Sequence, residues 1–525
     1  MASISFKNFK FIILFLSLSI LACKNQGGLK KESKSAESKP NIVFIYLDDL
    51  GYGDVSSYGA TEIKTPNIDK LADGGVKFTK GYASSATCTP SRYAILTGSY
   101  PWRNEDAAIL PGTAPLIIDT TQMTIPKMLK GEGYNTAVVG KWHLGLGRGN
   151  VNWNEHVSPG PNEIGFDYSY IMAATQDRVP TVYLKDGNVE NLDPNDPIEI
   201  DYDNEFEGEK TGYNSPELVT MKADKQHNNT VVNGVPRIGH MQGGEAARWS
   251  DVDMADHFLE KAQNYLKDQK NEEAPFFLYY ALQQPHVPRT PHPRFEGKTD
   301  LGLRGDAIVE ADWMIGEFIK TLEDEGLMEN TLIVFSSDNG PVLNDGYEDG
   351  AVEILGEHTP WGIYRGGKYS LFEAGTRIPF VTYWKGKIKP SVSDAMVSQL
   401  DLFNSISSLV GSDVKTDDGQ DLLDVFMGKS SEGREQVIIE AMSRTAFKKG
   451  DWVMIPPYKG PKVFKGKNIE TANAGNYQLY NLKEDSSQQN NLAKSNPEKL
   501  EDLKGEFRKI RGNPYEKVKP ATFKK

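Results

Sequence analysis

Short apolar runs rich in β-branched and aromatic residues recur along the chain, bounded by glycine, proline or acidic residues. Within them, hydrophobic positions follow one another almost without interruption instead of alternating with polar ones. Such continuity is typical of strands that are buried on both faces of a parallel sheet. The pattern therefore predicts central strands at residues 41–47, 136–140, 275–280 and 331–336.

Between these runs, hydrophobic residues recur with helical spacing. The spacing predicts helices at 66–74, 124–131 and 305–325, with an additional short strand at 76–78. A further helix is expected just after Pro90, because proline is favoured in the first turn of a helix. The alternation of strands and helices indicates an α/β fold, with a large mixed, mostly parallel sheet flanked by helices.

Two stretches depart from this alternation. Residues 179–244 are polar, rich in Asn, Asp and Gly, and without clear periodicity, so we interpret them as a long insertion that helps to shape a binding site. From about residue 433 the strand candidates become shorter, and a helical pattern follows at 498–511. We expect a main domain at 40–432 and a smaller C-terminal subdomain at 433–525, made of an antiparallel sheet and a helix.

The N-terminal segment resembles an export signal. Two lysines precede an apolar run at 11–22 that is too short to span a bilayer as a helix. The run ends in Ile20-Leu21-Ala22-Cys23, which resembles the lipobox of bacterial lipoproteins; an ordinary signal peptide with a chance cysteine is the alternative. We predict a signal peptide at 1–22, a diacylated Cys23 on a solvated tether at 23–39, and an exported lipoprotein of the outer membrane, attached by its lipid.

The composition is that of an ordinary globular protein, with 525 residues, 38% hydrophobic and 25% charged, and a formal net charge of -13. The length suffices for one large core and a smaller second one. A surface this acidic argues against a nucleic-acid-binding protein, and it leaves anion recognition to a few local cations in a pocket. The chain has two cysteines, Cys23 and Cys88; since the lipid takes the first, we expect no disulfide.

Acidic side chains follow two of the predicted strands at the point where each ends. Asp48 and Asp49 come directly after the run at 41–47, and Asp338-Asn339 closes the run at 331–336. Carboxylate and amide oxygens are hard ligands that suit Ca²⁺ or Mg²⁺. An Asp at a strand end is more often a turn former, but two such pairs at the edges of one sheet favour a metal site.

Basic side chains follow the other strands. Lys141 and His143 lie two residues apart just past one strand, and would point to the same side as a fixed cation and a titratable base. His286 follows another strand within Pro285-His286-Val287-Pro288, where the prolines would hold the imidazole stiffly. Lys368 ends a glycine-rich turn. Taken alone, each of these has a plain alternative, namely a core histidine or a solvated surface lysine.

Cys88 begins the most specific motif of the chain, Cys88-Thr89-Pro90-Ser91-Arg92, which Leu96-Thr97-Gly98 follows. It resembles the segment in which type I sulfatases have their catalytic cysteine oxidised to Cα-formylglycine (3-oxoalanine). A second specific motif runs from Gly133 to His143. With the acidic pairs, His286 and Lys368 in this order, the chain resembles type I sulfatases of the alkaline phosphatase-like superfamily over residues 40–515.

The resemblance implies a sulfuric ester hydrolase in which one hydroxyl of the hydrated formylglycine attacks sulfur. His286, together with Lys368, would protonate the leaving alcohol, and His143 would take the proton of the second hydroxyl so that the aldehyde returns. One Ca²⁺ ion and nearby cations would neutralise the sulfate oxygens. The implied catalytic residues are Cys88, Arg92, Lys141, His143, His286 and Lys368. The implied metal ligands are Asp48, Asp49, Cys88, Asp338 and Asn339. A formylglycine-generating enzyme would be the partner for maturation.

Other functions stay open from the sequence. A phosphatase or phosphonate hydrolase of the same superfamily usually needs a dinuclear zinc site, for which the eight histidines of this chain provide few strand-end ligands. A surface-anchored glycan-binding protein with an inactive sulfatase fold would have lost a catalytic element, and every element is present. If Cys88 were a buried structural thiol, the cations and histidines of the other motifs would remain unexplained.

The expected substrate is a sulfated carbohydrate. A lipid-anchored sulfatase resembles the enzymes that bacteria use on sulfated polysaccharides, so we expect it to act on an oligosaccharide of a polymer such as algal ulvan. An arylsulfatase or a glycosaminoglycan sulfatase is the alternative. Candidate sugar contacts are Asp177, Arg178, His240 and Trp361, each of which is explained equally well as a surface or packing residue.

Overall fold

A computed structural model of the protein describes Met1 and residues 39–149 and 151–516. The predicted signal peptide, the lipid on Cys23 and most of the tether lie outside the described residues. The described residues from Pro40 to Glu516 belong to one compact unit. Among the helices described, none is both long and apolar enough to cross a membrane.

A ten-stranded sheet forms the centre of this unit, in the order β14-β2-β13-β12-β1-β11-β3-β4-β5-β6. Neighbouring strands from β12 to β4 pair in parallel, whereas β13 and β5 run against their neighbours. The parallel centre consists of β12 (Thr331–Ser337), β1 (Asn41–Leu47), β11 (Phe276–Ala281), β3 (Asn135–Lys141) and β4 (Tyr168–Met172). The flanking strands are β14 (Ser391–Ser398), β2 (Val76–Tyr82), β13 (Phe380–Tyr383), β5 (Tyr183–Lys185) and β6 (Asn188–Val189).

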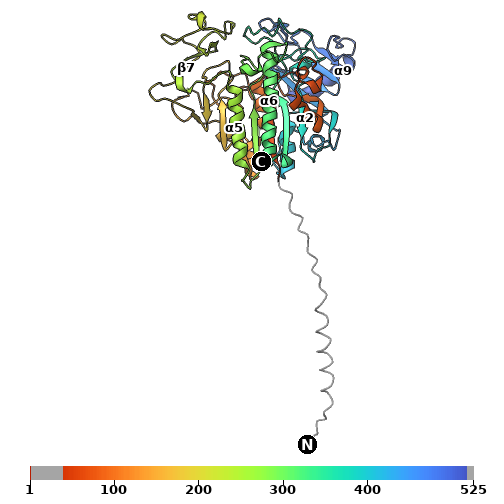
Figure 1. Ribbon diagram of the computed structural model, residues 1–525. Helices are drawn as coiled ribbons and strands as arrows, with labels where there is room; N and C mark the ends of the chain where they lie inside the picture. The colour runs from red at the N-terminus through yellow and green to blue at the C-terminus, as the bar shows by residue number, and fades with distance from the viewer. Residues whose placement is uncertain (2–38, 150, 517–525) are drawn as a thin grey trace. The chain divides into compact units, whose positions relative to one another are not determined.

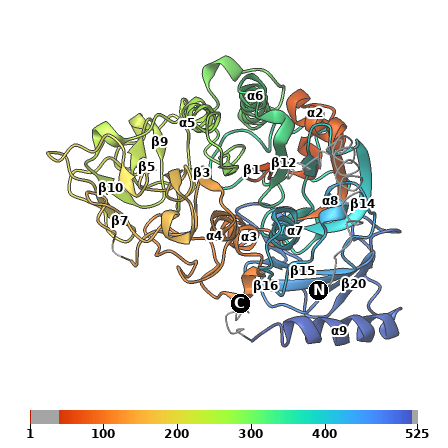
Figure 2. The ribbon, with the colours of Figure 1, turned by 90° about the horizontal axis from the view of Figure 1, so that it is seen from below.

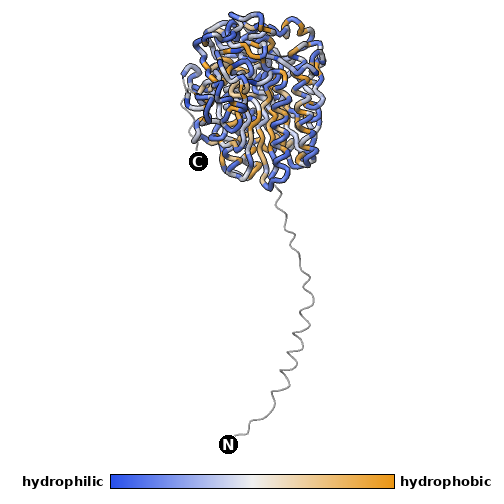
Figure 3. The backbone as a smooth tube through the Cα atoms, turned by 60° about the vertical axis from the view of Figure 1, so that its left-hand side comes forward, coloured by the Kyte–Doolittle hydropathy of each residue, from blue (hydrophilic) through white to orange (hydrophobic). Residues whose placement is uncertain are grey.

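Helices cover both faces of the sheet (Figures 1 and 2). Alternate residues of β1 enter two different cores: Phe44 packs in one, and Ile45 in the other. The first core includes residues of α3 (Cys88–Thr97), α4 (Ile125–Gly131), α7 (Asp401–Val410) and α8 (Leu423–Phe426). The second includes α2 (Pro66–Gly74), α5 (Met254–Gln269) and α6 (Gly302–Asp324). Because both faces are buried, most positions of the central strands are apolar, and the polar exceptions include Asn41, Thr331 and Lys141 at strand ends. Figure 3 shows hydrophobic segments in orange within the tube.

The predicted strands and helices of the main domain are present, with shifts at some of their ends: the strand predicted at 76–78 continues to Tyr82, and the helix predicted from 305 begins at Gly302. The helix of the Cys88 segment begins at Cys88 and not after Pro90. Pro90 is therefore the third residue of that helix, where an amide N–H still lacks a partner within the helix, so that a proline costs nothing there. The shift matters because it places Cys88 at the start of the helix.

Residues 179–244 are largely irregular, as predicted, but they include β5 and β6, the last two strands of the central sheet. The remainder consists of turns and short two-stranded pairs. Its strands are β7 (Glu199–Asp201), which pairs with β10 (His240–Gln242), and β8 (Val231–Val232), which pairs with β9 (Val235–Pro236). In Figure 1 this region lies beside the α5 side of the sheet.

The C-terminal part forms an antiparallel sheet of four strands, covered by α9 (Pro497–Arg511). Its strands are β15 (Gln436–Ala441), β16 (Arg444–Lys449), β17 (Trp452–Ile455) and β20 (Gln478–Asn481). A separate hairpin joins β18 (Val463–Phe464) to β19 (Ile469–Glu470). One hydrophobic core contains both Phe447 of this sheet and Ala94 of α3. The expected fold class, a mostly parallel α/β sheet with a smaller C-terminal antiparallel sheet, is confirmed.

Candidate active site

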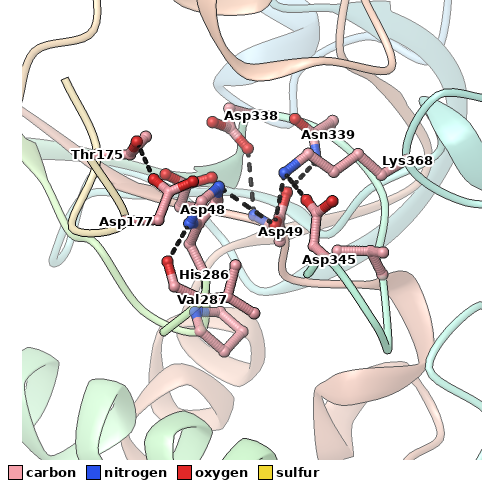
Figure 4. A network of polar contacts seen from close by, with 12 residues as sticks. Asp48, Asp49, Thr175, Asp177, His286, Val287, Asp338, Asn339, Asp345 and Lys368 are labelled. Carbon is pink, nitrogen blue, oxygen red and sulfur yellow. Dashed lines mark hydrogen bonds and ion pairs between the residues drawn. The ribbon is translucent and has the colours of Figure 1, made fainter. Parts of the chain in front are cut away.

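The carboxyl ends of β1, β12 and β3 bring the predicted polar residues together at one edge of the sheet. Asp48 and Asp49 follow β1, Asp338 follows β12, and Lys141 is the last residue of β3. Parallel strands end at the same edge, where open α/β sheets bind their ligands. Figure 4 shows the acidic side chains converging with Lys368 and His286.

The acidic cluster has the composition of a cation site. One carboxylate oxygen from each of Asp48, Asp49 and Asp338 lies within 4.8 Å of the others, and Asn339 donates to Asp49 Oδ1 at 2.7 Å. Within the described structure, Asp48 Oδ1 and Asn339 Oδ1 are buried without a hydrogen-bond partner. Burial, together with the negative charge of Asp338, raises the pKa of Asp48 to about 6. These oxygens therefore fit a hard divalent cation, which would relieve both the repulsion and the desolvation.

Arg92 and Lys141 surround this cluster with buried positive charge. From α3, Arg92 Nη2 donates to Asp338 Oδ2 at 2.9 Å and lies 3.3 Å from Asp48 Oδ2. Lys141 donates to the same oxygen of Asp48. Burial would lower the pKa of Arg92, but the carboxylate of Asp338 outweighs it and keeps the guanidinium charged.

Lys368 lies on the other side of the acidic cluster. Its ammonium group donates to Asp49 Oδ2 at 2.9 Å and to Asp345 Oδ2 at 2.8 Å. Burial would lower the pKa of Lys368, but Asp345 and Asp49 outweigh it and hold the pKa well above its ordinary value. Asp345 was not among the site residues predicted from the sequence.

The two predicted histidines each present one ring nitrogen that can accept a proton. His143 Nε2 donates to the carbonyl oxygen of Leu110 at 3.0 Å, and among the described residues its Nδ1 has no partner. His286 Nδ1 donates to the carbonyl oxygen of Val287 at 2.6 Å, and its Nε2 lies 3.8 Å from Asp49 Oδ2. Burial first, and then the nearby lysines, lower the pKa of both rings well below the ordinary value, so both are neutral.

Cys88 lies at the start of α3, in a cavity of about 380 Å³ that His143, His286 and Lys368 also line. It is a free cysteine and is almost fully buried. The next residue, Thr89, donates its hydroxyl to the carbonyl oxygen of His143 at 2.9 Å and so ties the two motifs together. Burial raises the pKa of the Cys88 thiol, which disfavours the thiolate.

Asp177 and Arg178, two of the predicted sugar contacts, line the same cavity. With them lies His227, a residue of the insertion that the sequence analysis did not select. His227 Nε2 lies 3.3 Å from Asp177 Oδ2, and its Nδ1 is 2.7 Å from Asp224 Oδ1. Burial would lower the pKa of His227, but its hydrogen bonds to the two carboxylates outweigh it and raise the pKa. The cavity wall is thus polar and includes a third histidine.

The structure does not bring His240 and Trp361 to the Cys88 cavity. His240 lies on β10 with its Nδ1 2.9 Å from Glu209 Oε2, within the insertion. Trp361 lines a neighbouring cavity of about 340 Å³.

Comparisons with known proteins agree with this geometry. The sequence model of the family described as Sulfatase matches residues 40–412. The chain is 48% identical over 495 residues to an N-acetylgalactosamine-6-O-sulfatase of Bacteroides thetaiotaomicron, a match that covers 93% of this chain and 96% of that protein. It is 30% identical over 408 residues to arylsulfatase A of Homo sapiens, covering 76% of this chain and 70% of that protein.

One solved structure is similar over most of the chain. It is described in connection with the metabolism of multiple glycosaminoglycans by Bacteroides thetaiotaomicron. The two superpose with a TM-score of 0.89 at 48% identity, over 91% of this chain and 100% of that one.

Proposed function

The chain belongs to the sulfatase family and is a sulfuric ester hydrolase, and from this premise we propose that it removes sulfate from a carbohydrate. The 48% identity to an N-acetylgalactosamine-6-O-sulfatase supports a 6-O-sulfated N-acetylgalactosamine as the sugar. The polar wall of the Cys88 cavity, with Asp177, Arg178 and His227, supplies the donors and acceptors that sugar hydroxyls need. No comparable similarity supports algal ulvan as the substrate, which stays a prediction from the sequence.

The observation that carries the proposal is the common cavity of Cys88, His143, His286 and Lys368. Cys88 is proposed to be oxidised to formylglycine by a maturation enzyme, as its motif predicts. The raised pKa of its buried thiol supports this, because an unmodified Cys88 would be a poor thiolate nucleophile. When hydrated, the aldehyde supplies one hydroxyl for attack on sulfur and a second one for release of sulfate.

The side chains around Cys88 are suited to binding the sulfate group and moving protons. Arg92, Lys141 and Lys368 place buried positive charge where the sulfate oxygens would gain negative charge. His143 Nδ1 is proposed to accept a proton, because its other ring nitrogen is fixed as a donor to Leu110.

His286 is proposed to donate a proton to the leaving alcohol at Nε2. Its pKa is lowered by burial and by Lys368, so the ring is neutral until a negatively charged sulfate ester binds beside it. An anion next to the ring favours the imidazolium form, which couples protonation of the acid to substrate binding.

The metal ion of the family is proposed to be Ca²⁺, held by Asp48, Asp49, Asp338 and Asn339 together with residue 88. The two unpartnered oxygens, Asp48 Oδ1 and Asn339 Oδ1, support this set among the described residues. A bound divalent cation supplies positive charge that polarises the sulfate group and orients it.

The anchoring of the protein is a further proposal, based on the sequence alone. Residues 20–23 support lipidation of Cys23 and an exported outer-membrane lipoprotein. Labelling with a palmitate analogue should mark the protein, and Cys23→Ser should abolish the label; a labelled Cys23→Ser variant would refute lipidation at this residue.

Two measurements test the proposed reaction. Mass spectrometry of the tryptic peptide Gly81–Arg92 should show the aldehyde at residue 88, and an unmodified thiol in fully active protein would refute the mechanism. Desulfation of N-acetylgalactosamine 6-sulfate, of its 4-sulfated isomer and of an ulvan fragment should be compared with that of an aryl sulfate. Turnover of aryl sulfates alone would reject the carbohydrate substrate.

A further inference from the structure

A lysine from the C-terminal part of the chain reaches the cavity that contains Cys88. Lys467 lies in the turn between β18 and β19 and lines this cavity together with Lys368. Its side chain is 8% exposed, although its neighbours Lys465 and Asn468 are exposed to solvent. The fold therefore withdraws one charge of this turn from water, which carries a cost unless the charge is used.

The ammonium group of Lys467 is only partly compensated. Its Nζ lies 2.9 Å from Asp345 Oδ1 and 3.7 Å from Asp224 Oδ2, but it donates no hydrogen bond within the described structure. Asp345 also accepts from Lys368, and Asp224 from His227. Each carboxylate thus has a second basic partner, so neither of them is dedicated to Lys467. A buried ammonium group with three N–H donors and no hydrogen bond calls for an anionic ligand.

Lys467 also lines the neighbouring cavity of about 340 Å³ that contains Trp361. Val342 and Ile469 line this second cavity and pack against Tyr369, which lines the first one. A small apolar cluster thus lies between the cavities, and Lys467 reaches both. The second cavity combines aromatic, apolar and polar side chains at a volume typical of ligand sites.

We propose that Lys467 binds an anionic group on the sugar next to the one that carries the scissile sulfate, and that this second sugar occupies the cavity of Trp361. The anion is a carboxylate or a second sulfate. The inference rests on the proposed function, because it needs a saccharide substrate. It makes the enzyme selective for polyanionic oligosaccharides, which the net charge of -13 would otherwise repel at long range.

The test uses three disaccharides that carry the same scissile sulfate. The first has a uronic acid as the second sugar, the second is its carboxyl-reduced form, and the third is that reduced form with a second sulfate. Steady-state kinetics are measured for the matured protein and for Lys467→Gln, Lys467→Arg and, as a control from the same turn, Lys465→Gln.

We expect Lys467→Gln to lower the preference in kcat/KM for an anionic disaccharide over the reduced one about ten-fold, mainly through KM, because a hydrogen bond to a charged group is lost. Lys467→Arg should retain most of the preference, and Lys465→Gln all of it. If Lys467→Gln loses the preference for the uronic acid disaccharide over the reduced one, the ligand of Lys467 is a carboxylate. If it loses the preference for the disulfated disaccharide over the reduced one, the ligand is a sulfate.

Two results would overturn this inference and leave the proposed function intact. One is equal turnover of all three disaccharides by the unsubstituted protein. The other is an equal loss on all three in Lys467→Gln, which would make Lys467 a residue that only positions Lys368 through Asp345. If the unsubstituted protein desulfates aryl sulfates and none of the saccharides, the proposed function fails and the inference fails with it.

Discussion

Asp345→Asn would remove one negative charge beside Lys368, and the contacts of this carboxylate set the size of the effect. Asp345 Oδ2 accepts from Lys368 at 2.8 Å, its two oxygens accept from the Tyr369 hydroxyl at 3.0 and 2.9 Å, and its Oδ1 lies 2.9 Å from Lys467. An asparagine keeps one acceptor oxygen and turns an NH₂ group toward an ammonium group. At least one charge-assisted hydrogen bond is lost, which amounts to about 1.5–3 kcal/mol.

The loss should appear in catalysis because Lys368 lines the cavity of Cys88. Burial lowers the pKa of Lys368, and Asp345 is the larger of the two acidic influences that outweigh it, ahead of Asp49. Without Asp345 the ammonium group is drawn toward Asp49 and away from the position in which a sulfate oxygen would meet it. If that contact is needed in the transition state, kcat/KM falls roughly ten- to a hundred-fold, at about 1.4 kcal/mol per factor of ten.

Asp349→Asn is the matched control. Asp349 Oδ2 accepts from Arg289 at 2.5 Å, and the Asp349 side chain is 2% exposed, against 7% for Asp345, but Asp349 does not line the Cys88 cavity. Each substitution removes a buried charge-assisted hydrogen bond, so each should lower the free energy of unfolding in urea by about 1.5–3 kcal/mol. Only Asp345→Asn should also lower kcat/KM for the sulfated sugar. If both variants show the same drop in the free energy of unfolding and Asp345→Asn keeps the kcat/KM of the unsubstituted protein, the positioning role of Asp345 is refuted.

Three further predictions concern other parts of the site. Hydrogen bonds to Asp177 and Asp224 outweigh burial and raise the pKa of His227 above its ordinary value of 6.5. The stability that these two hydrogen bonds contribute is therefore fully present below about pH 6.5, and it is lost as the pH rises through the pKa of His227 in the folded state. His227→Gln should flatten this loss in urea unfolding across pH, and an unchanged profile would contradict the assignment. Removal of metal by a chelator, verified by metal analysis, should abolish activity, and added Ca²⁺ should restore it. Asp338→Asn should raise the Ca²⁺ concentration that restores half of the activity roughly ten-fold or more. Full activity of metal-free protein would exclude the metal site. Arg92→Lys keeps the charge but loses the planar fork, so kcat/KM should fall about ten-fold; kinetics equal to those of the unsubstituted protein would count against a role in sulfate binding.

The central strands could be predicted because burial on both faces leaves a direct trace in the sequence. In β1 each residue from Ile42 to Leu47 meets one of two cores, so this run is continuously apolar. β14 gives no such trace, since it lies at the edge of the sheet and its first residues are exposed. β16 gives no such trace either, because it carries Lys448. The charge of Lys448 is buried against Glu373 at 3.2 Å, and this compensation comes from a distant part of the chain.

The candidate site divides in the same way. Asp48 and Asp338 could be predicted as neighbours because each follows a parallel strand, and strand order places such ends together. Asp345, His227 and Lys467 come from loops, the insertion and a hairpin, where hydrophobic periodicity says nothing about position. Their place in the cavity depends on tertiary contacts, such as the pairing of His227 with Asp177.

His240 and Trp361 were selected by residue type alone, and neither lines the Cys88 cavity, although Trp361 lines the neighbouring cavity that we propose for a second sugar. A side chain that suits sugar binding gives no information on where it lies. Asp177 and Arg178 were selected on the same grounds and do line the cavity. Residue type without an element to position it was therefore a weak guide, in contrast to the residues at strand ends.

The arrangement of charges explains how an acidic protein can bind a sulfate ester. Arg92, Lys141 and Lys368 each pair with a carboxylate that also belongs to the candidate metal set, namely Asp338, Asp48 and Asp49. A divalent cation held by these carboxylates would take up their negative charge, which would leave the N–H donors of the three basic residues for the sulfate oxygens. The proposed metal ligands and the proposed sulfate-binding cations thus form one coupled set, and substitutions in the two groups should not be additive. Because both groups are buried, their field acts on the cavity with little screening, whereas the acidic surface is screened by salt. Local positive charge in the cavity can therefore outweigh the net charge of the whole chain.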